Sequence, residues 1–443
     1  MSASGDAERA GALGLRRGHL QYLPVAAGRV EFASEVRRAI LEMQPAVVAV
    51  ELPGWLERHY MAAVGRLPAM SVIVYPEDEG SERGVYVVVE PADPFVEAVR
   101  SAREAGADIV WLEPDAIDRP HLPETYPDPW AMRAIGYQKY VEAYRVHRQG
   151  RPVEAGEHAA AMAWRLQGTD PERETLVVVS LNLLEALLEA MEQPQESPRA
   201  GRPREAELVN PHPECLAQIT AEYPFLQEEY ERYRTRMAPA ELADRRLAQF
   251  RLLKEAERNY EAQTGERVSH WQRRTMARYT RNLAMIDNQL VANLFDLTAA
   301  ARGVVDDNFA WELWQAANAY PWQEEHGPLQ TVNLNAEEVF LNSRKMRLRR
   351  RLPREKRRLM PRGLKPRLQE KYKGEWAQQL DGDAICSYPP EDIVIEDYGK
   401  LLRRKAKSLL SEERARVEPF RTSVEDGIDL RETIRHWHEG RIF

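Results

Sequence analysis

Hydrophobic residues in the first 190 positions follow two alternating patterns. Between Val30 and Met43 they recur at helical spacing, which places Val36 and Ile40 on one face. The next segment, Val47–Val50, is a short β-branched run, which is typical of a buried parallel strand. Similar short runs are predicted as strands at 70–75, 84–90, 108–112 and 176–180, and helical patterns occur at 94–105, 129–148, 153–167 and 183–191. This alternation predicts an α/β fold with a mostly parallel sheet flanked by helices.

One of these helices has clear signals at both ends. Asp93 is a good N-cap residue, and Pro94 fits the first helical position. Gly106 suits the left-handed residue that commonly ends a helix. We therefore expect a helix over 94–105, followed directly by the strand at 108–112.

The pattern changes after residue 192 and divides the chain into four regions. The α/β domain covers 13–192, and a segment rich in Pro, Glu, Arg and Ser, 193–213, is predicted to be a linker. Long, charged, periodic segments predict a helical region over 214–330. The last region, 331–443, is a mixed α+β region. Because its final residues resemble the start of a strand, we expect the chain to be a fragment of a longer protein.

Composition narrows the class of protein. The chain has 443 residues, of which 43% are hydrophobic and 30% charged, as in globular proteins. No apolar run reaches the length of a bilayer span, and the N-terminus lacks a signal-peptide pattern, so we expect a cytoplasmic protein without membrane contact. The two cysteines, Cys215 and Cys386, are far apart, which excludes a disulfide scaffold and a cysteine-rich zinc site.

Charge is distributed unevenly along the chain. The net charge is −8, yet residues 344–367 contain thirteen Lys and Arg against the single acid Glu355, a local charge of +12. We predict a helix over 344–351, and the density of positive charge makes the segment a candidate for nucleic acid or another polyanion. A solvated charged face, or a partner for the acidic surface of the same chain, is the alternative. The candidate polyanion-binding residues are Arg347, Arg349, Arg350, Arg351, Lys356, Arg357 and Arg358.

Polar residues accompany the predicted strands of the α/β domain. In open α/β sheets ligands bind at the carboxyl ends of the strands, so we expect His19 and Glu51 to meet there. The further candidates at this edge are Glu113, Asp115, Glu157 and His158. A neutral imidazole and carboxylates can hold a divalent metal ion that activates water. Alternatively His19 acts as a general base that a carboxylate orients. A Glu at a strand end also commonly serves as a helix cap or an ion-pair partner.

The order of these motifs resembles the TraB/Tiki and erythromycin-esterase/ChaN-like superfamily. The similar segments are Gly18-His19, the strand Pro45–Leu52 that carries Glu51, the strand that ends at Glu113, and the helix that begins with Glu157-His158. The resemblance covers about 13–192 and implies a metal-dependent protease or a hydrolase of small esters. It also implies that His19 and Glu51 are the central site residues, supported by Glu113 or Asp115 and by Glu157. His19, Glu51 and Glu157 would be the metal ligands.

The sequence departs from the superfamily motifs at two places, so we consider a second function as well. His158 stands where the superfamily has Arg, and Ser180-Leu181-Asn182-Leu183 replaces a Gly-x-x-His motif. Asn182 can bind a substrate but cannot act as a base. The two hypotheses are therefore a hydrolase-like enzyme of unknown substrate, and a catalytically degenerate scaffold that binds protein or nucleic acid through its helical and basic regions. A Gly-rich phosphate loop of the Walker or dinucleotide type is missing, so nucleotide hydrolysis is not expected.

Overall fold

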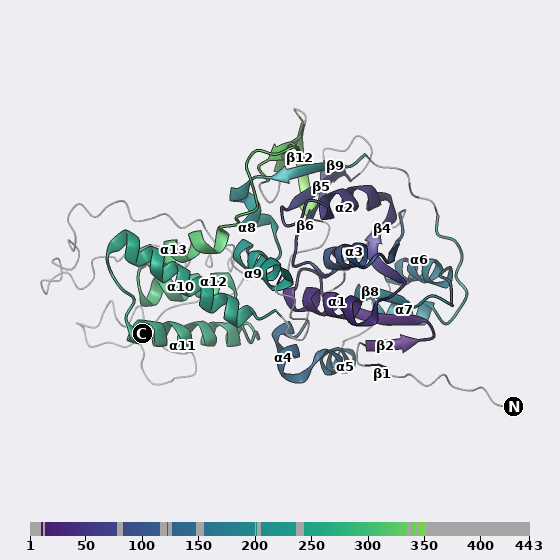
Figure 1. Cartoon of the computed structure of the whole chain (residues 1–443), viewed down its shortest axis with the longest axis horizontal. Coiled ribbons are helices and arrows are strands. Elements are labelled where there is room, and N and C mark those ends of the chain that lie inside the picture. The colour runs from purple at the N-terminus through teal and green to yellow at the C-terminus, as the bar shows by residue number, and fades with distance from the viewer. Residues whose placement is uncertain are drawn as a thin grey trace, which may run out of the picture. The chain divides into compact units, whose positions relative to one another are not determined.

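The computed structural model describes residues 10–11, 14–77, 83–115, 122, 126–147, 155–199, 201, 205–235, 243–334, 338–341 and 344–350 (Figure 1). The chain divides into two units, Met1–Arg367 and Leu368–Phe443. Every described residue belongs to the first unit. In the described part of the chain, no helix has the length and apolar character needed to cross a membrane.

Four parallel strands form the centre of the first sheet. Their order is β3 (Leu20–Val25), β8 (Thr175–Ser180), β4 (Val47–Pro53) and β7 (Asp108–Glu113). The short strands β1 (Ala10–Gly11) and β2 (Gly14–Arg17) extend the sheet antiparallel beyond β3. This sheet confirms the α/β prediction.

Helices cover both faces of this sheet (Figure 1). On one face, α1 (Val30–Met43) and α3 (Pro94–Ala105) pack with α5 (Tyr137–His147) over Leu23, Val48 and Val178. On the other face, α6 (Gly156–Gln167) and α7 (Leu184–Ala190) pack over Tyr22, Ala49 and Val177. Because side chains alternate across a strand, each central strand contributes to both cores.

The ends of α3 follow the sequence signals. The Asp93 carboxylate accepts hydrogen bonds from the backbone N–H groups of Phe95 (2.9 Å) and Val96 (3.1 Å). Gly106 has φ +71°, the left-handed conformation that glycine adopts without steric cost. The predicted bounds of this helix are confirmed.

A second, mixed sheet was not predicted. Its order is β10 (Thr331–Val332), β9 (Glu207–Pro211), β5 (Ser71–Pro76), β6 (Arg83–Val89), β12 (Arg344–Arg350) and β11 (Glu338–Leu341). Strand β9 lies inside the segment predicted to be a linker. Strand β12 pairs parallel with β6, so the prediction of a helix at the start of the basic segment is wrong. Its backbone hydrogen bonds are made in a ladder between two strands instead of within a helix.

The helical region is confirmed between 216 and 318. It contains α8 (Leu216–Ile219), α9 (Pro224–Thr235), α10 (Arg245–Thr264), α11 (His270–Ile286), α12 (Leu294–Val304) and α13 (Asp307–Asn318). Asp306 caps α13 by accepting from the N–H of Phe309 at 2.7 Å. The core of this region includes Tyr230, Leu252, Leu297, Phe309 and Leu313.

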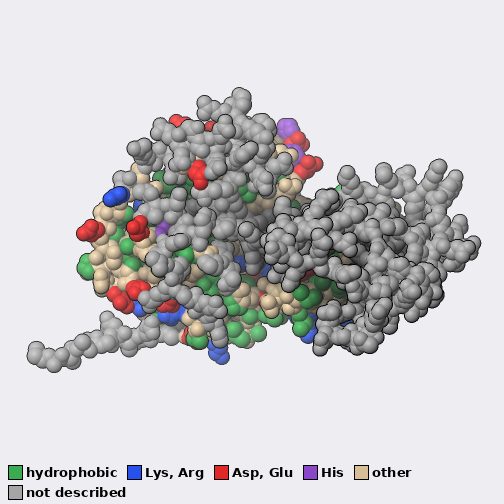
Figure 2. All heavy atoms as spheres, turned by 180° about the vertical axis from the view of Figure 1, so that it is seen from behind, with side chains coloured by type: hydrophobic (Ala, Val, Ile, Leu, Met, Phe, Trp, Pro, Cys, Tyr) green, Lys and Arg blue, Asp and Glu red, His purple; other side chains and the backbone are tan. Residues whose placement is uncertain are grey.

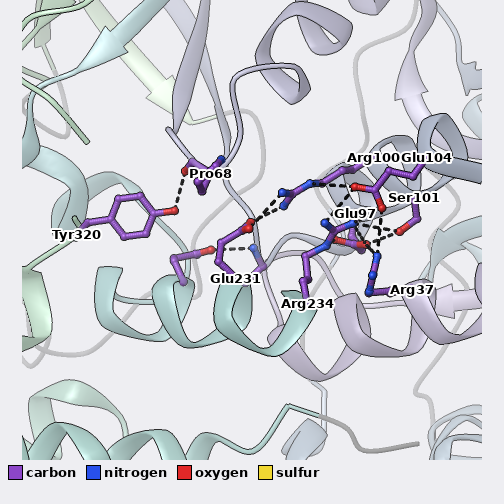
Figure 3. Close-up of polar contacts among 11 residues, drawn as sticks. Arg37, Pro68, Glu97, Arg100, Ser101, Glu104, Glu231, Arg234 and Tyr320 are labelled. Atoms are coloured by element: carbon purple, nitrogen blue, oxygen red, sulfur yellow. Dashed lines mark hydrogen bonds and ion pairs between the residues drawn. The ribbon is translucent and has the colours of Figure 1, made fainter. Parts of the chain in front are cut away.

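Buried ion pairs join the helical region to the α/β domain. Arg234 of α9 donates to Glu97 (2.8 Å) and Glu104 (3.0 Å) of α3, as Figure 3 shows. Arg245 of α10 donates to Glu31 of α1 at 2.6 Å. The two regions pack together in this unit without an extended spacer between them.

The remaining short elements connect these regions. They are η1 (Gly54–Leu56), α2 (Glu57–Val64), η2 (Pro129–Ala131), α4 (Met132–Ile135) and η4 (Pro213–Cys215). The helix predicted over 129–148 is divided at Gly136, which has φ +82°.

Candidate functional site

The carboxyl edge of the first sheet contains a topological switch point. Strand β8 lies between β3 and β4. The chain leaves β3 for α1 on one face of the sheet and leaves β8 for α7 on the opposite face. In open α/β sheets such a change of face opens the crevice in which ligands bind. This edge is therefore the place to look for a site.

Glu51 and Ser180 form a hydrogen-bonded pair at this switch point. The Glu51 side chain is fully buried, at 0% exposure, near the end of β4. One carboxylate oxygen accepts from the backbone N–H of Ser180 at 2.6 Å, and the other accepts from the Ser180 hydroxyl at 2.9 Å. A buried carboxylate is tolerated only when donors replace its lost water, and Ser180 supplies two.

Two further buried polar residues lie at the same edge. Glu113 ends β7, and Asn182 follows β8 by two residues. His158 is buried in the first turn of α6. Separate strands thus bring Glu51, Glu113 and Asn182 to one rim of the sheet.

Asp115 and Glu157 occupy other surroundings. Asp115 forms an ion pair with Arg165 of α6 at 3.3 Å. The same guanidinium donates to the backbone oxygen of Trp111 at 2.6 Å, so Arg165 binds the end of β7. Glu157 is exposed at the start of α6. The structure therefore gives Asp115 an ion-pair role and leaves the Glu157 side chain in solvent.

The expectation that His19 meets Glu51 is wrong. His19 precedes β3, and its backbone oxygen accepts from the N–H of Thr175, the first residue of β8. Its ring nitrogen Nε2 lies 3.0 Å from the Thr169 hydroxyl. The strand registers place His19 level with Glu174 and Glu51 level with Val179. Five residues at about 3.3 Å each separate the two levels by about 16 Å.

This separation also rules out the predicted set of metal ligands. A single ion bonds its ligands at about 2.0–2.3 Å, so His19 and Glu51 cannot share one. Among the residues that the structure describes, no group of three or more His, Cys, Asp or Glu side chains is arranged to hold a metal ion.

Sequence reasoning missed two residues at the carboxyl edge. Ser180 entered only as part of a replaced motif, although its place at the end of a predicted strand beside Glu51 was a usable signal. Tyr137 of α5 donates its hydroxyl to the backbone oxygen of Pro24 in β3 at 2.7 Å. Burial raises the pKa of Tyr137 well above its usual value, so the phenol stays protonated.

The candidate polyanion-binding residues fall in two groups. Arg347, Arg349 and Arg350 belong to β12, where Arg347 pairs with Arg83 and Arg349 with Val85 of β6. The other candidates lie outside the described residues: Arg351, Lys356, Arg357 and Arg358.

We compared the chain with models of protein families, with curated proteins and with solved structures, and none of them matches it.

Proposed function

We propose that the α/β domain is a hydrolase-like domain whose site lies at the carboxyl edge and is centred on Glu51 and Ser180. The observation that carries this proposal is the pair of hydrogen bonds between them at the switch point. The resemblance of 13–192 to hydrolases of small esters supports the same reaction class. His19 has no part in this site because it lies at the opposite edge.

The chemistry follows from the orientation of the pair. As the Ser180 oxygen bonds to an ester carbonyl carbon, its proton passes to the Glu51 carboxylate. The leaving alkoxide takes that proton, and an acyl-serine remains. Water then attacks the acyl group, with Glu51 accepting a proton and returning it to Ser180. The Asn182 side-chain N–H₂ is the nearby polar group suited to donate to the developing oxyanion.

A scaffold is the second candidate, and burial favours it. Glu51 has 0% exposure and Ser180 has 1%, so a substrate reaches them only after neighbouring residues move. In a scaffold, the pair would act solely as a polar cross-link between β4 and β8. The helical region would then carry the function.

A kinetic comparison of four proteins separates the candidates. Hydrolysis of a panel of p-nitrophenyl esters is measured for the wild type, Ser180→Ala, Glu51→Gln and His19→Ala. We expect kcat/KM to fall by about 10²–10⁴ in the first two variants. His19→Ala should stay within about twofold of the wild type, because this residue lies at the other edge. Circular dichroism at the assay temperature confirms that each variant is folded.

Two results would reject the hydrolase. One is a wild type that hydrolyses none of the esters, and the other is a Ser180→Ala protein as active as the wild type. Either result supports the scaffold. If a metal ion assists the reaction, Glu51→Gln must also lower the metal content of the purified protein. Equal metal content in the wild type and in Glu51→Gln would reject a metal ion bound by Glu51.

A further inference from the structure

Helix α11 exposes a stripe of five residues at coiled-coil spacing. Trp271, Arg274, Arg278, Arg281 and Met285 follow each other at alternating intervals of three and four residues. This spacing places them along one side of the helix. Trp271 is 68% exposed and Met285 is 61% exposed, and the three arginines are exposed as well. We call these five residues the α11 seam.

The seam lies away from the packed side of α11. Met276, Thr280 and Ala284 are buried and share the opposite side of the helix. That side packs against α12, and Figure 1 shows α11 at the rim of the helical region. Among the residues that the structure describes, the seam is thus an exposed helix face rather than part of the helical core.

The seam arginines differ from the neighbouring ones in their partners. Arg273 pairs with Glu257 at 2.7 Å, and Arg267 pairs with Glu261 at 2.6 Å. Within the described part of the chain, by contrast, no ion pair is formed by the seam arginines: Arg274, Arg278 and Arg281. Helix α11 contains no acidic residue at all.

The surrounding surface strengthens the positive field. Without the buried Arg245, residues 246–286 contain nine Lys and Arg against four Glu, a net charge of +5 in a chain of −8. Seen from behind, the part of the described surface that is visible shows acidic and basic side chains interspersed (Figure 2). The hairpin of α10 and α11 is a basic feature on an acidic protein.

We propose that the α11 seam binds an acidic amphipathic α-helix of a partner protein. Heptad spacing is the signature of helix-on-helix contact, with apolar anchors here at the two ends and cations between them. Tryptophan, arginine and methionine are the side chains enriched in protein interfaces. Carboxylates at the facing central positions of the partner would complement the three arginines.

Two other occupants fit this surface less well. A second copy of α11 would bring arginine against arginine, and like charges in contact are destabilising. Nucleic acid would engage the arginines and stack on Trp271. It would leave the aliphatic Met285 and its exposed neighbour Ile286, at 74%, without contacts. The apolar content therefore favours protein. This inference is independent of the site at the carboxyl edge.

A designed peptide tests the proposal. The probe is a fluorescent 21-residue helical peptide with Leu at the two outer seam-facing positions and Glu at the three central ones. Fluorescence anisotropy measures its binding to the full chain. A second peptide has Lys in place of the three Glu, and a 20-nucleotide oligothymidine represents nucleic acid. We expect the wild type to bind the Glu peptide at least about tenfold more tightly than the Lys peptide.

Variants of the seam must reverse this preference. The triple variant Arg274→Glu, Arg278→Glu, Arg281→Glu should bind the Lys peptide more tightly than the Glu peptide. Trp271→Ala should weaken binding of the Glu peptide about tenfold. The matched control changes the same amount of charge elsewhere on the hairpin: Lys254→Glu, Arg258→Glu and Arg267→Glu.

Three results would overturn the proposal. They are equal binding of the two peptides by the wild type, tighter binding of oligothymidine than of the Glu peptide, and a control triple that weakens binding as much as the seam triple does. A reversed preference is a gain of binding, which misfolding cannot produce. Ester hydrolysis is not read out here, so failure of the hydrolase proposal leaves this test unaffected.

Discussion

Helices α9 and α11 use arginine in opposite ways. Arg234 of α9 has a side chain only 6% exposed and binds two carboxylates of α3 (Figure 3). By contrast, the seam arginines of α11 are exposed and unpaired within the described residues. The same residue type therefore stabilises the fold in one helix and remains available for a partner in the other. Burial together with the presence of a carboxylate decides between these roles.

Arg234 stabilises the fold because its buried guanidinium is paired with the buried carboxylate of Glu97. Glu97 has 0% exposure, and its carboxylate accepts from Arg234 through both oxygens at 2.8 and 2.9 Å. Burial alone would lower the pKa of Arg234, but the charge of Glu97 outweighs it and raises the pKa above its usual value. The guanidinium thus stays charged, and removing it would leave the buried Glu97 carboxylate with only the longer contact to Arg37, at 3.8 Å.

The largest expected loss of stability follows from replacing Arg234. Arg234→Met should lower the free energy of unfolding by about 3–5 kcal/mol, because the buried Glu97 would lose its two short hydrogen bonds and keep only the longer contact to Arg37, at 3.8 Å. Urea unfolding followed by circular dichroism measures the change. The double variant Arg234→Met, Glu97→Gln is the control and should recover part of the loss. A loss below about 1 kcal/mol in the single variant would show that the pair is not desolvated as the structure indicates.

A smaller loss of stability is expected when Asp128, the buried partner of Arg245, is replaced. Asp128 accepts from the N–H groups of Trp130, Leu290 and Val291 at 2.8–3.0 Å and pairs with Arg245. Burial would raise the pKa of Asp128, but Arg245 and these N–H groups outweigh it and lower the pKa. Asp128→Asn should cost about 1–3 kcal/mol at pH 7, because bonds to a charged group are lost.

The pH dependence of this loss has a definite sign. A carboxylate with a lowered pKa in the folded state stabilises the fold above its ordinary pKa of about 3.9. That contribution disappears as the pH falls through the lower folded value. The difference in unfolding free energy between wild type and Asp128→Asn should therefore be full at pH 5–7 and shrink below about pH 4. A difference that grows on acidification would contradict the lowered pKa.

The contrast between local and long-range contacts explains what the sequence could predict. The bounds of α3 were predictable because Asp93 and Gly106 act on the nearest turns of the backbone. The core strands at 108–112 and 176–180 were predictable from their β-branched runs. The edge at which Glu51, Glu113 and Asn182 lie followed from their position after these strands, since parallel strands end at one rim.

The edge at which His19 lies was predicted wrongly because the hydrophobic pattern does not reveal strand β3. Strand β3 reads Leu-Gln-Tyr-Leu-Pro-Val, and Pro24 is unusual inside a sheet. Without this strand, His19 was assigned to a carboxyl end although it precedes β3. The second sheet was missed for a different reason: β9 and β12 join it from segments far along the chain. Such pairing depends on tertiary contacts that no local pattern contains.

The smallest expected change in stability follows from replacing the exposed seam arginines of α11. The seam triple, Arg274→Glu, Arg278→Glu, Arg281→Glu, should change the free energy of unfolding by less than about 0.5 kcal/mol per residue, because these side chains are exposed and form no ion pair with any residue that the structure describes. Urea unfolding beside Arg234→Met makes the comparison within one protein. Relief of repulsion inside the basic hairpin could make the triple variant slightly more stable. A loss as large as that of Arg234→Met would mean that the seam arginines stabilise the fold, and the distinction between α9 and α11 would fail.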